Sequence, residues 1–263
     1  MRKIVIKQQG KLFQETAYID LKSYRVEMNG ACKCIQQLRL DSPVSGRIYG
    51  LLLNYQGALA ALGPAVNEAP YKEPPKAPIL YIKPVNTING FGKLIPVPEE
   101  EGGLEMGAAL GVVIGKKAVK VEAESALHYV SGYTIVNDVS IPHSNYHRPA
   151  VKQKARDGFC PIGPWIMDRD EISDPNHLGI RVFINGELRQ ESNTANLIRS
   201  VARSIADITE FMTLDEGDLL LMGVPERAPL AKVGDTVRLE IDEIGYLENT
   251  LVSESDYMSG GAI

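Results

Sequence analysis

The residues best suited to chemistry lie in one stretch near the middle of the chain. Asp138 ends an apolar run that begins at Gly132, and a carboxylate at a strand end can act as a base, bind a metal or cap the next turn. Four cations then fall within nine residues: Arg148, Lys152, Lys154 and Arg156. Arginine binds carboxylates bidentately and lysine supplies a point charge, so this run suits a substrate with several carboxylates. The alternative is a solvated loop.

Other catalytic patterns are weak. The chain has four histidines, and the one pair that is four residues apart is flanked by Pro142 and Pro149, which disfavour a helical metal site. We interpret all four as surface or structural residues: His128, His143, His147 and His177. The sequence contains neither a glycine-rich phosphate loop nor a nucleophile elbow. The residues alone therefore indicate a cationic loop near a strand-end aspartate.

Size and composition indicate a globular domain. The chain has 263 residues, of which 44% are apolar and 23% charged, with a net charge of −5. This length can bury one full core without disulfides, and three cysteines are too few for a disulfide framework. The acidic balance disfavours a nucleic-acid partner, and neither a signal-peptide core nor a membrane-length apolar run is visible. We expect a cytoplasmic protein without a membrane partner.

Short elements separated by glycine and proline predict a β-rich α+β fold. Residues 1–42 are expected to form a small N-terminal β appendage of two or three strands, before a main domain over 43–263. Asn185-Gly186 predicts a hairpin turn. Apolar runs predict buried strands at 80–82, 110–114 and 133–136, and closing strands at 218–221, 236–241 and 247–252.

One long helix is expected between Ala195 and Met212. Its apolar residues fall at spacings of 4, 4, 3 and 4, which makes one stripe: Leu197, Val201, Ile205, Ile208 and Met212. Asn193 and Thr194 are suitable caps for its first turn. A short helix is also expected over 122–130. We expect the long helix to pack against the core.

The stretch from Gly132 to Trp165 resembles the signature region of the fumarylacetoacetate hydrolase family; it reads GYTIVNDVSIPHSNYHRPAVKQKARDGFCPIGPW. Further family-like pieces are GRIYGLLLNY at 46–55, IKPVNT at 82–87, LGVVIGK at 110–116, NGELRQESNTANLI at 185–198 and EGDLLLMGVP at 216–225. The resemblance covers about 46–252 in the expected order. It implies a mixed β-sandwich or β-roll with few helices, in agreement with the pattern of elements.

The metal-binding positions of the family are altered in this chain. The resemblance implies a Glu-x-Glu pair before the VVIG strand and an Asp in the NDVS segment, which together hold a divalent cation, Mg or Mn. This chain has Gly107 and Ala109 at the two Glu positions and keeps Asp138, the one candidate metal ligand. Glu105 shares the strand parity and could substitute. A hard cation held by one carboxylate would bind weakly, so the sequence does not favour a metal.

The positions of the hydrolytic acid/base pair are altered too. After Asn-Tyr, hydrolase-type members carry a His and, three residues on, a Glu, and this chain has Ala58 and Ala61 there. The Thr-Gly-Thr-Pro segment near the end of the family pattern reads Met222-Gly223-Val224-Pro225. These substitutions disfavour a hydrolase that activates water.

The pattern of substitutions is similar to one branch of the family, the N-terminal half or separate small subunit of bacterial isomerase/decarboxylases of 4-hydroxyphenylacetate (homoprotocatechuate) degradation. The branch shares the RPA-x-K-x-K-x-RDGFCPIG run that begins at Arg148. It implies decarboxylation of 5-oxopent-3-ene-1,2,5-tricarboxylate and isomerisation of 2-hydroxyhepta-2,4-diene-1,7-dioate. Asp138 would then transfer the proton and Lys154 would stabilise the enolate, with Lys83, Arg148, Lys152 and Arg156 as substrate-binding cations.

Three interpretations stay open. The chain is a metal-free decarboxylase or isomerase, a noncatalytic subunit that supports a metal-bearing homologue, or a hydrolase or tautomerase of another acylpyruvate-like acid. Members of the family usually form dimers, so the resemblance implies a homodimer or association with a metal-bearing homologous subunit.

Overall fold

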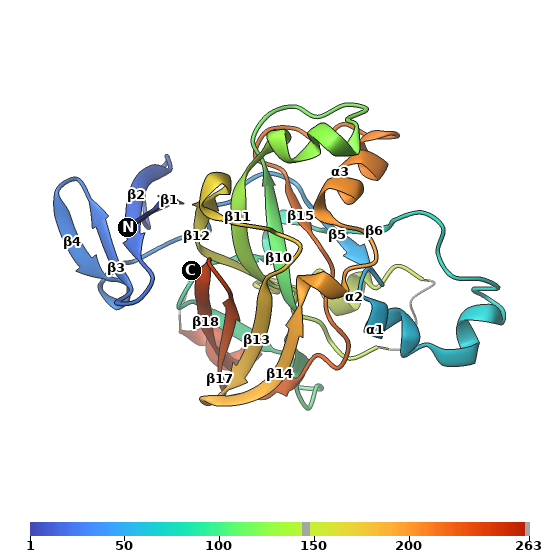
Figure 1. Ribbon diagram of the computed structural model, residues 1–263. Helices are drawn as coiled ribbons and strands as arrows, with labels where there is room; N and C mark the ends of the chain where they lie inside the picture. The colour runs from blue at the N-terminus through green and yellow to red at the C-terminus, as the bar shows by residue number, and fades with distance from the viewer. Residues whose placement is uncertain (144–147, 261–263) are drawn as a thin grey trace.

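The computed structural model describes residues 1–143 and 148–260. Its largest sheet has 11 strands, in the order β4-β3-β2-β1-β12-β11-β10-β15-β5-β6, with β7 paired to β12 (Figure 1). The bounds are β1 (Arg2–Ile6), β2 (Glu15–Asp20), β3 (Arg25–Met28), β4 (Ala31–Cys34), β5 (Ile48–Leu52), β6 (Ile79–Lys83), β7 (Ile88–Asn89), β10 (Ala108–Ile114), β11 (Val130–Asn137), β12 (Cys160–Asp168) and β15 (Leu219–Leu221).

A second sheet of five strands has the order β14-β13-β17-β18-β8, and β16 pairs with β9. These strands are β8 (Leu94–Val97), β9 (Leu104–Glu105), β13 (Gly179–Ile184), β14 (Glu187–Asn193), β16 (Leu230–Ala231), β17 (Thr236–Ile241) and β18 (Gly245–Ser253). Trp165 of β12 joins the two sheets, because it is fully buried and its Nε1 donates to the Ile244 carbonyl at 2.8 Å. The expected β-rich α+β class is confirmed.

The central strands read as unbroken apolar runs because both of their faces are covered. Every residue of β10 is buried, so its sequence does not alternate as a half-exposed strand does. The predicted turn at Asn185-Gly186 is confirmed, since it joins β13 to β14 with positive φ at both residues. Strand 80–82 lies in β6, but the prediction that it is buried is wrong. β6 is the last strand of its sheet, and Ile82 is 64% exposed.

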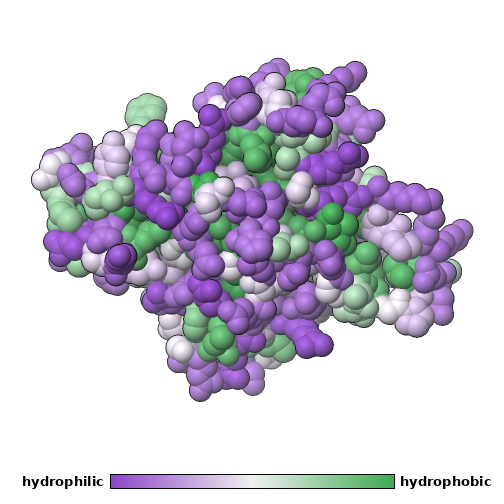
Figure 2. Space-filling model, in the orientation of Figure 1, coloured by the Kyte–Doolittle hydropathy of each residue, from purple (hydrophilic) through white to green (hydrophobic). Residues whose placement is uncertain are grey.

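The helices are short. They are α1 (Gln56–Ala60), α2 (Val151–Lys154), α3 (Val201–Thr209) and α4 (Glu254–Ser259), with 3-10 turns at Ile35–Gln37, Gly63–Asn67, Val85–Thr87, Ala123–Tyr129, Arg169–Glu171 and Thr194–Asn196. The short helix expected over 122–130 corresponds to the 3-10 turn at Ala123–Tyr129. None of the described helices is long and apolar enough to cross a membrane. On the face seen in Figure 2, hydrophilic residues interrupt the apolar ones.

The prediction of one long helix over 195–212 is wrong for the residues before Val201. Its α-helical portion is α3, whose N-cap is Ser200, not Asn193. The segment before it is held extended by Asn54, which accepts from the backbone N–H of Ile198 through its carbonyl and from that of Arg199 through its side chain. These contacts lie 145 residues apart in sequence, so a local pattern could not reveal them. The apolar stripe of α3 is buried as expected.

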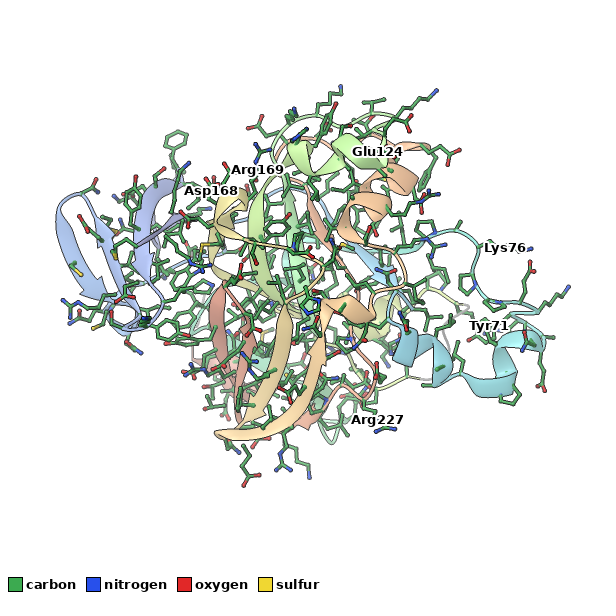
Figure 3. The ribbon with its side chains drawn as sticks, in the orientation of Figure 1. Tyr71, Lys76, Glu124, Asp168, Arg169 and Arg227 are labelled. Atoms are coloured by element: carbon green, nitrogen blue, oxygen red, sulfur yellow. The ribbon has the colours of Figure 1, made fainter. Side chains whose placement is uncertain are left out.

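Residues 1–42 contain four strands, where two or three were expected. They extend one edge of the large sheet, because β1 pairs antiparallel with β12 (blue strands, Figure 1). Lys3 Nζ lies 2.8 Å from Asp168 Oδ2, and Asp168 and Arg169 are labelled beside these strands in Figure 3. The division of the chain at residue 42 stays a prediction.

Candidate active site

Asp138 lies at the centre of a buried charged cluster. It follows β11 directly and is placed by its backbone N–H, which donates to the Gly107 carbonyl at 2.8 Å. Its carboxyl is fully buried. Tyr81 donates its hydroxyl proton to Asp138 Oδ2 at 2.6 Å. Because strand side chains alternate, Tyr81 and Lys83 of β6 point to the same side, toward this carboxylate.

Lys83 lies beneath Asp138, away from solvent. Its Nζ is 3.0 Å from Asp138 Oδ1 and its side chain is 0% exposed. The same ammonium donates to the carbonyls of Lys154 at 2.7 Å and Val139 at 3.2 Å. Two hydrogen bonds to backbone carbonyls and the ion pair with Asp138 Oδ1 surround this ammonium. Lys83 therefore fixes the charge and backbone of the site from a position that solvent does not reach.

Lys154, the last residue of α2, covers the other side of Asp138. Its Nζ donates to Asp138 Oδ2 at 2.7 Å and to Ser140 Oγ at 2.6 Å, and it lies 5.0 Å from the centre of the Tyr81 ring. Unlike Lys83, its side chain keeps 13% exposure. With both lysines protonated, two cations and one carboxylate give the cluster a net charge of +1; burial lowers the pKa of Lys83 and the Asp138 charge opposes that shift. The positive charge attracts an anionic substrate oxygen, and the third N–H of Lys154 can donate a hydrogen bond to it.

The electrostatics hold Asp138 in its charged form. Burial opposes ionisation of the carboxyl, but the charges of Lys154 and Lys83 and the hydrogen bonds from Lys154 and Tyr81 outweigh it, so the pKa of Asp138 lies well below its ordinary value. Burial and the adjacent Asp138 charge raise the pKa of Tyr81 well above its ordinary value. Tyr81 is therefore a hydrogen-bond donor at neutral pH.

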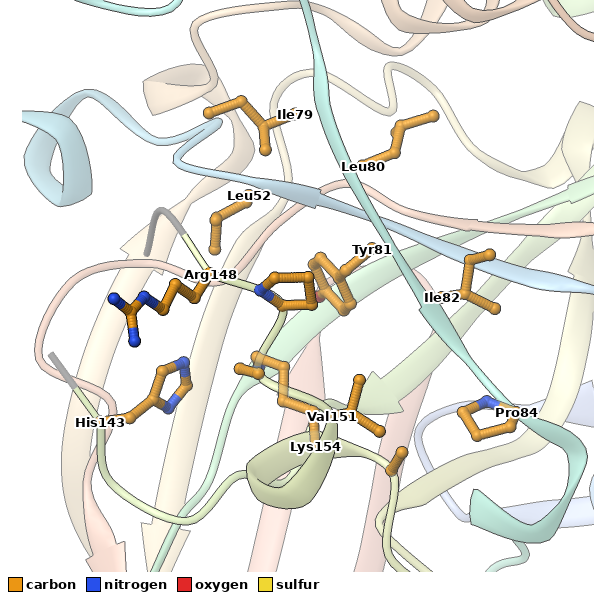
Figure 4. Close-up of a pocket in the computed structure, with 13 residues that line it drawn as sticks. Leu52, Ile79, Leu80, Tyr81, Ile82, Pro84, His143, Arg148, Val151 and Lys154 are labelled. Atoms are coloured by element: carbon orange, nitrogen blue, oxygen red, sulfur yellow. The ribbon is translucent and has the colours of Figure 1, made fainter. Parts of the chain in front are cut away.

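Two adjoining cavities open onto this cluster. The polar one has a volume of about 200 Å³ and is lined by Asp138, Ser140, Lys154 and Glu105, among others. The apolar one has a volume of about 560 Å³, within the range of small-molecule sites. Figure 4 shows Arg148 and Lys154 at this second cavity. Both cavities are lined by Leu52, Tyr81, His143 and Lys154.

The structure brings together part of the predicted site. Asp138 and Lys154 are in contact, Lys83 pairs with Asp138 from below, and Arg148 lines the apolar cavity. Lys152 is exposed and Arg156 Nη2 pairs with Glu254 Oε1 of α4 at 2.9 Å, and neither is among the residues that line the two cavities. The cations of this run do not all face the cavities, because successive residues of the single-turn helix α2 point in different directions. His147 lies outside the described residues.

Several residues of the site were not predicted from the sequence. Tyr81 and Ser140 contact Asp138 or Lys154, and His143, interpreted as structural, lines both cavities while its Nδ1 lies 3.0 Å from the Ile141 carbonyl oxygen. The two-residue spacing of Tyr81 and Lys83 on a strand could have identified Tyr81. Glu226 and Arg227 also line the polar cavity, and no local pattern marks them.

The donor set does not fit a divalent cation. Both oxygens of Asp138 face ammonium groups, at 2.7 and 3.0 Å. Ala109 is fully buried in an apolar cluster, and Gly107 has no room for a side chain, because a Cβ there would lie 2.6 Å from the Asp138 carbonyl oxygen. Over residues 1–143 and 148–260, no group of three or more His, Cys, Asp or Glu side chains is placed to hold a metal.

The tight packing at Gly107 gives a first prediction. Gly107→Ala is expected to cost about 1–3 kcal/mol of unfolding free energy, because the new methyl group meets a backbone oxygen and Val224 Cγ2 at 2.9 Å. Urea denaturation followed by fluorescence measures the change. Gly102→Ala is the matched control, since a Cβ at Gly102 has no atom within 4 Å. Equal midpoints for the two variants would contradict the packing described here.

Comparison with known proteins identifies the family. Residues 47–252 match the fumarylacetoacetate (FAA) hydrolase C-terminal domain. The chain is 40% identical over 213 residues to the 4-hydroxyphenylacetate degradation bifunctional isomerase/decarboxylase of Escherichia coli, covering 81% of this chain and 48% of that protein. This chain belongs to the fumarylacetoacetate hydrolase family, as the motifs indicated. It spans about half the length of the curated relatives it first matches.

Solved structures show the same fold along almost the whole chain. The 5-carboxymethyl-2-hydroxymuconate delta-isomerase of Mycobacterium smegmatis superposes with a TM-score of 0.78 at 28% identity, covering 96% of this chain and 99% of that one. The 2-hydroxyhepta-2,4-diene-1,7-dioate isomerase of Mycobacterium marinum gives a TM-score of 0.78 at 27% identity, covering 97% and 99%.

Proposed function

We propose that this chain decarboxylates 5-oxopent-3-ene-1,2,5-tricarboxylate, isomerises 2-hydroxyhepta-2,4-diene-1,7-dioate, or does both, in the breakdown of 4-hydroxyphenylacetate. The observation that carries the proposal is the Lys154 ammonium, held 2.7 Å from the buried Asp138 carboxylate at the junction of two cavities. The names of the relatives support the substrate class.

The chemistry requires a cation where negative charge develops. Loss of CO₂ sends the electron pair of the broken C–C bond through the conjugated enone to the ketone oxygen, which becomes a dienolate and then takes a proton. The Lys154 ammonium is preorganised to stabilise that oxygen, since Asp138 and Ser140 already fix its position. One such donor contributes about 3 kcal/mol to lowering a barrier. No step requires a metal.

Other residues bind and orient the substrate. Arg148 can bind a distal carboxylate where it lines the apolar cavity. Lys83 and Asp138 act as positioning residues, because both side chains are fully buried and pair with each other, and Lys154 covers the second oxygen of Asp138. Lys152 and Arg156 are expected from the sequence to bind substrate, but neither lines the two cavities, so we assign them no role.

Turnover by the purified chain alone tests the proposal. We expect loss of the dienone absorbance of the tricarboxylate and release of one CO₂ per substrate. The alternative of a noncatalytic subunit is favoured by Ala58, Ala61, Gly107 and Ala109, which replace the hydrolytic and metal-binding residues of the family. Turnover that requires a homologous metal-bearing subunit would establish that alternative and overturn the proposal. Gel filtration of the same sample tests for the homodimer that we also propose.

A further inference from the structure

Glu105 is a second carboxyl group in the polar cavity, and it comes from a different part of the chain from Asp138. It ends β9 and is tied to the Asp138 segment by two backbone hydrogen bonds. Its N–H donates to the Ser140 carbonyl at 2.8 Å, and the Ser140 N–H donates to its carbonyl at 3.2 Å. Its side chain lines the same cavity as Asp138 and Lys154. Glu105 and Asp138 therefore line one small space and come from segments that are hydrogen-bonded to each other.

The two carboxyl groups differ in what surrounds them. Asp138 is fully buried and contacts two ammonium groups and a phenol. Glu105 is only partly buried, and burial raises its pKa above the ordinary value, although the charges of His143 and Lys154 oppose the shift and that of Asp138 adds to it. When the environments of two carboxyl groups move their pKa values apart, the group with the lower pKa stays a fixed anion. The group with the higher pKa can carry a proton.

We propose that Glu105 is the catalytic residue that carries the proton in this cavity, with Asp138 as a fixed anion that orients Lys154. The inference rests on the proposed function. In the isomerisation, the Glu105 carboxylate accepts the proton of the 2-hydroxyl group. The O–H electron pair forms the C2=O bond and the electron pair of the C2=C3 double bond moves to C3=C4. The electron pair of the C4=C5 double bond takes the proton from Glu105 and forms the new C–H bond at carbon 5. The carboxylate is regenerated and no co-reactant is needed.

The pH dependence of this step involves every titratable or charged side chain that lines the cavity with Glu105. These are Tyr81, Asp138, His143, Lys154, Glu226 and Arg227. Glu226 is the other glutamate, but it sits against α1, because a Cβ at Gly57 would lie 2.1 Å from its carboxyl carbon. Glu105 is therefore the carboxyl group that combines attachment to the Asp138 segment with a place in the cavity.

Glu105→Gln tests the inference, because glutamine keeps the shape and cannot exchange the proton. We expect kcat for the isomerisation to fall by about 10²–10⁴-fold while KM stays within about threefold. We also expect loss of the pH-dependent limb of kcat that reflects the carboxyl group. Glu100→Gln is the control, since Glu100 is exposed and does not line either cavity. A Glu105→Gln variant as active as the control, in a chain that turns over, would overturn the inference and leave the proposed function intact.

A second readout does not depend on turnover. ¹³C NMR of glutamate-labelled protein should contain one carboxyl titration above the ordinary glutamate pKa that is absent from Glu105→Gln. If the wild-type chain turned over neither substrate, the proposed function would fail. A Glu105 titration at or below the ordinary value would independently refute the assignment of Glu105 as the proton carrier.

Discussion

Lys154→Met is expected to lower kcat for decarboxylation by about 10²–10³-fold, the effect of removing one preorganised donor from a developing oxyanion. Methionine has nearly the length of lysine but has neither the charge nor the N–H donors. The cluster loses the cation that touches both Asp138 and the polar cavity. Its net charge falls from +1 to 0, so an anionic transition state loses its attraction to the site.

The fold should survive this change, because Lys83 and Tyr81 still hold the Asp138 carboxylate. Lys152→Met is the matched control: Lys152 lies on the same short helix, and its side chain is exposed. Steady-state kinetics should find the loss in kcat of the first variant and near wild-type constants for the second. Equal activity of the two variants would show that Lys154 is not the electrophilic group.

Asp138→Asn is expected to cost about 3–5 kcal/mol of unfolding free energy, the range for breaking a buried ion pair from one side. Lys83 has a fully buried ammonium and would lose its only carboxylate partner in the described structure. Lys154 keeps some exposure and can be solvated from the cavity. Adding Lys83→Met to Asp138→Asn should therefore recover part of the loss, because the unpaired buried charge is removed.

The pH dependence of the Asp138→Asn loss has a defined sign. The folded-state pKa of Asp138 lies below its unfolded-state value, so its stabilisation is fully present above the unfolded pKa of about 3.9 and is lost as pH falls through the folded pKa. Urea denaturation at several pH values should find that wild type and variant differ by a constant unfolding free energy near neutrality. This difference should become smaller below about pH 4. Asp170→Asn, at an 83% exposed side chain, is the control. A small gap at every pH would contradict the account of the buried cluster.

Much of the fold could be predicted from local patterns. The unbroken apolar run of β10 indicated a covered strand, and Asn185-Gly186 indicated the hairpin of β13 and β14. Each pattern reflects a conformational preference of the residues that form it. The family motifs located Asp138 and Lys154, and in the structure Lys154 Nζ lies 2.7 Å from Asp138 Oδ2. These features depend on short stretches of sequence.

Other features depend on partners far along the chain. Lys83 points inward because Asp138 and the Lys154 carbonyl meet it there, 71 residues away in the latter case. Arg156 turns away because Glu254, 98 residues later, supplies a carboxylate. A run of cations in sequence therefore predicts a positive loop, and tertiary contacts decide which of its side chains face a cavity.

In our proposal, the Lys154 ammonium takes the place of a bound cation in stabilising the dienolate oxygen. Decarboxylation of the tricarboxylate by the purified chain in excess EDTA tests it most directly. We expect the same rate with EDTA as without it, and no increase when Mg²⁺ or Mn²⁺ is restored. A rate that falls to background in EDTA and returns with either cation would contradict the claim.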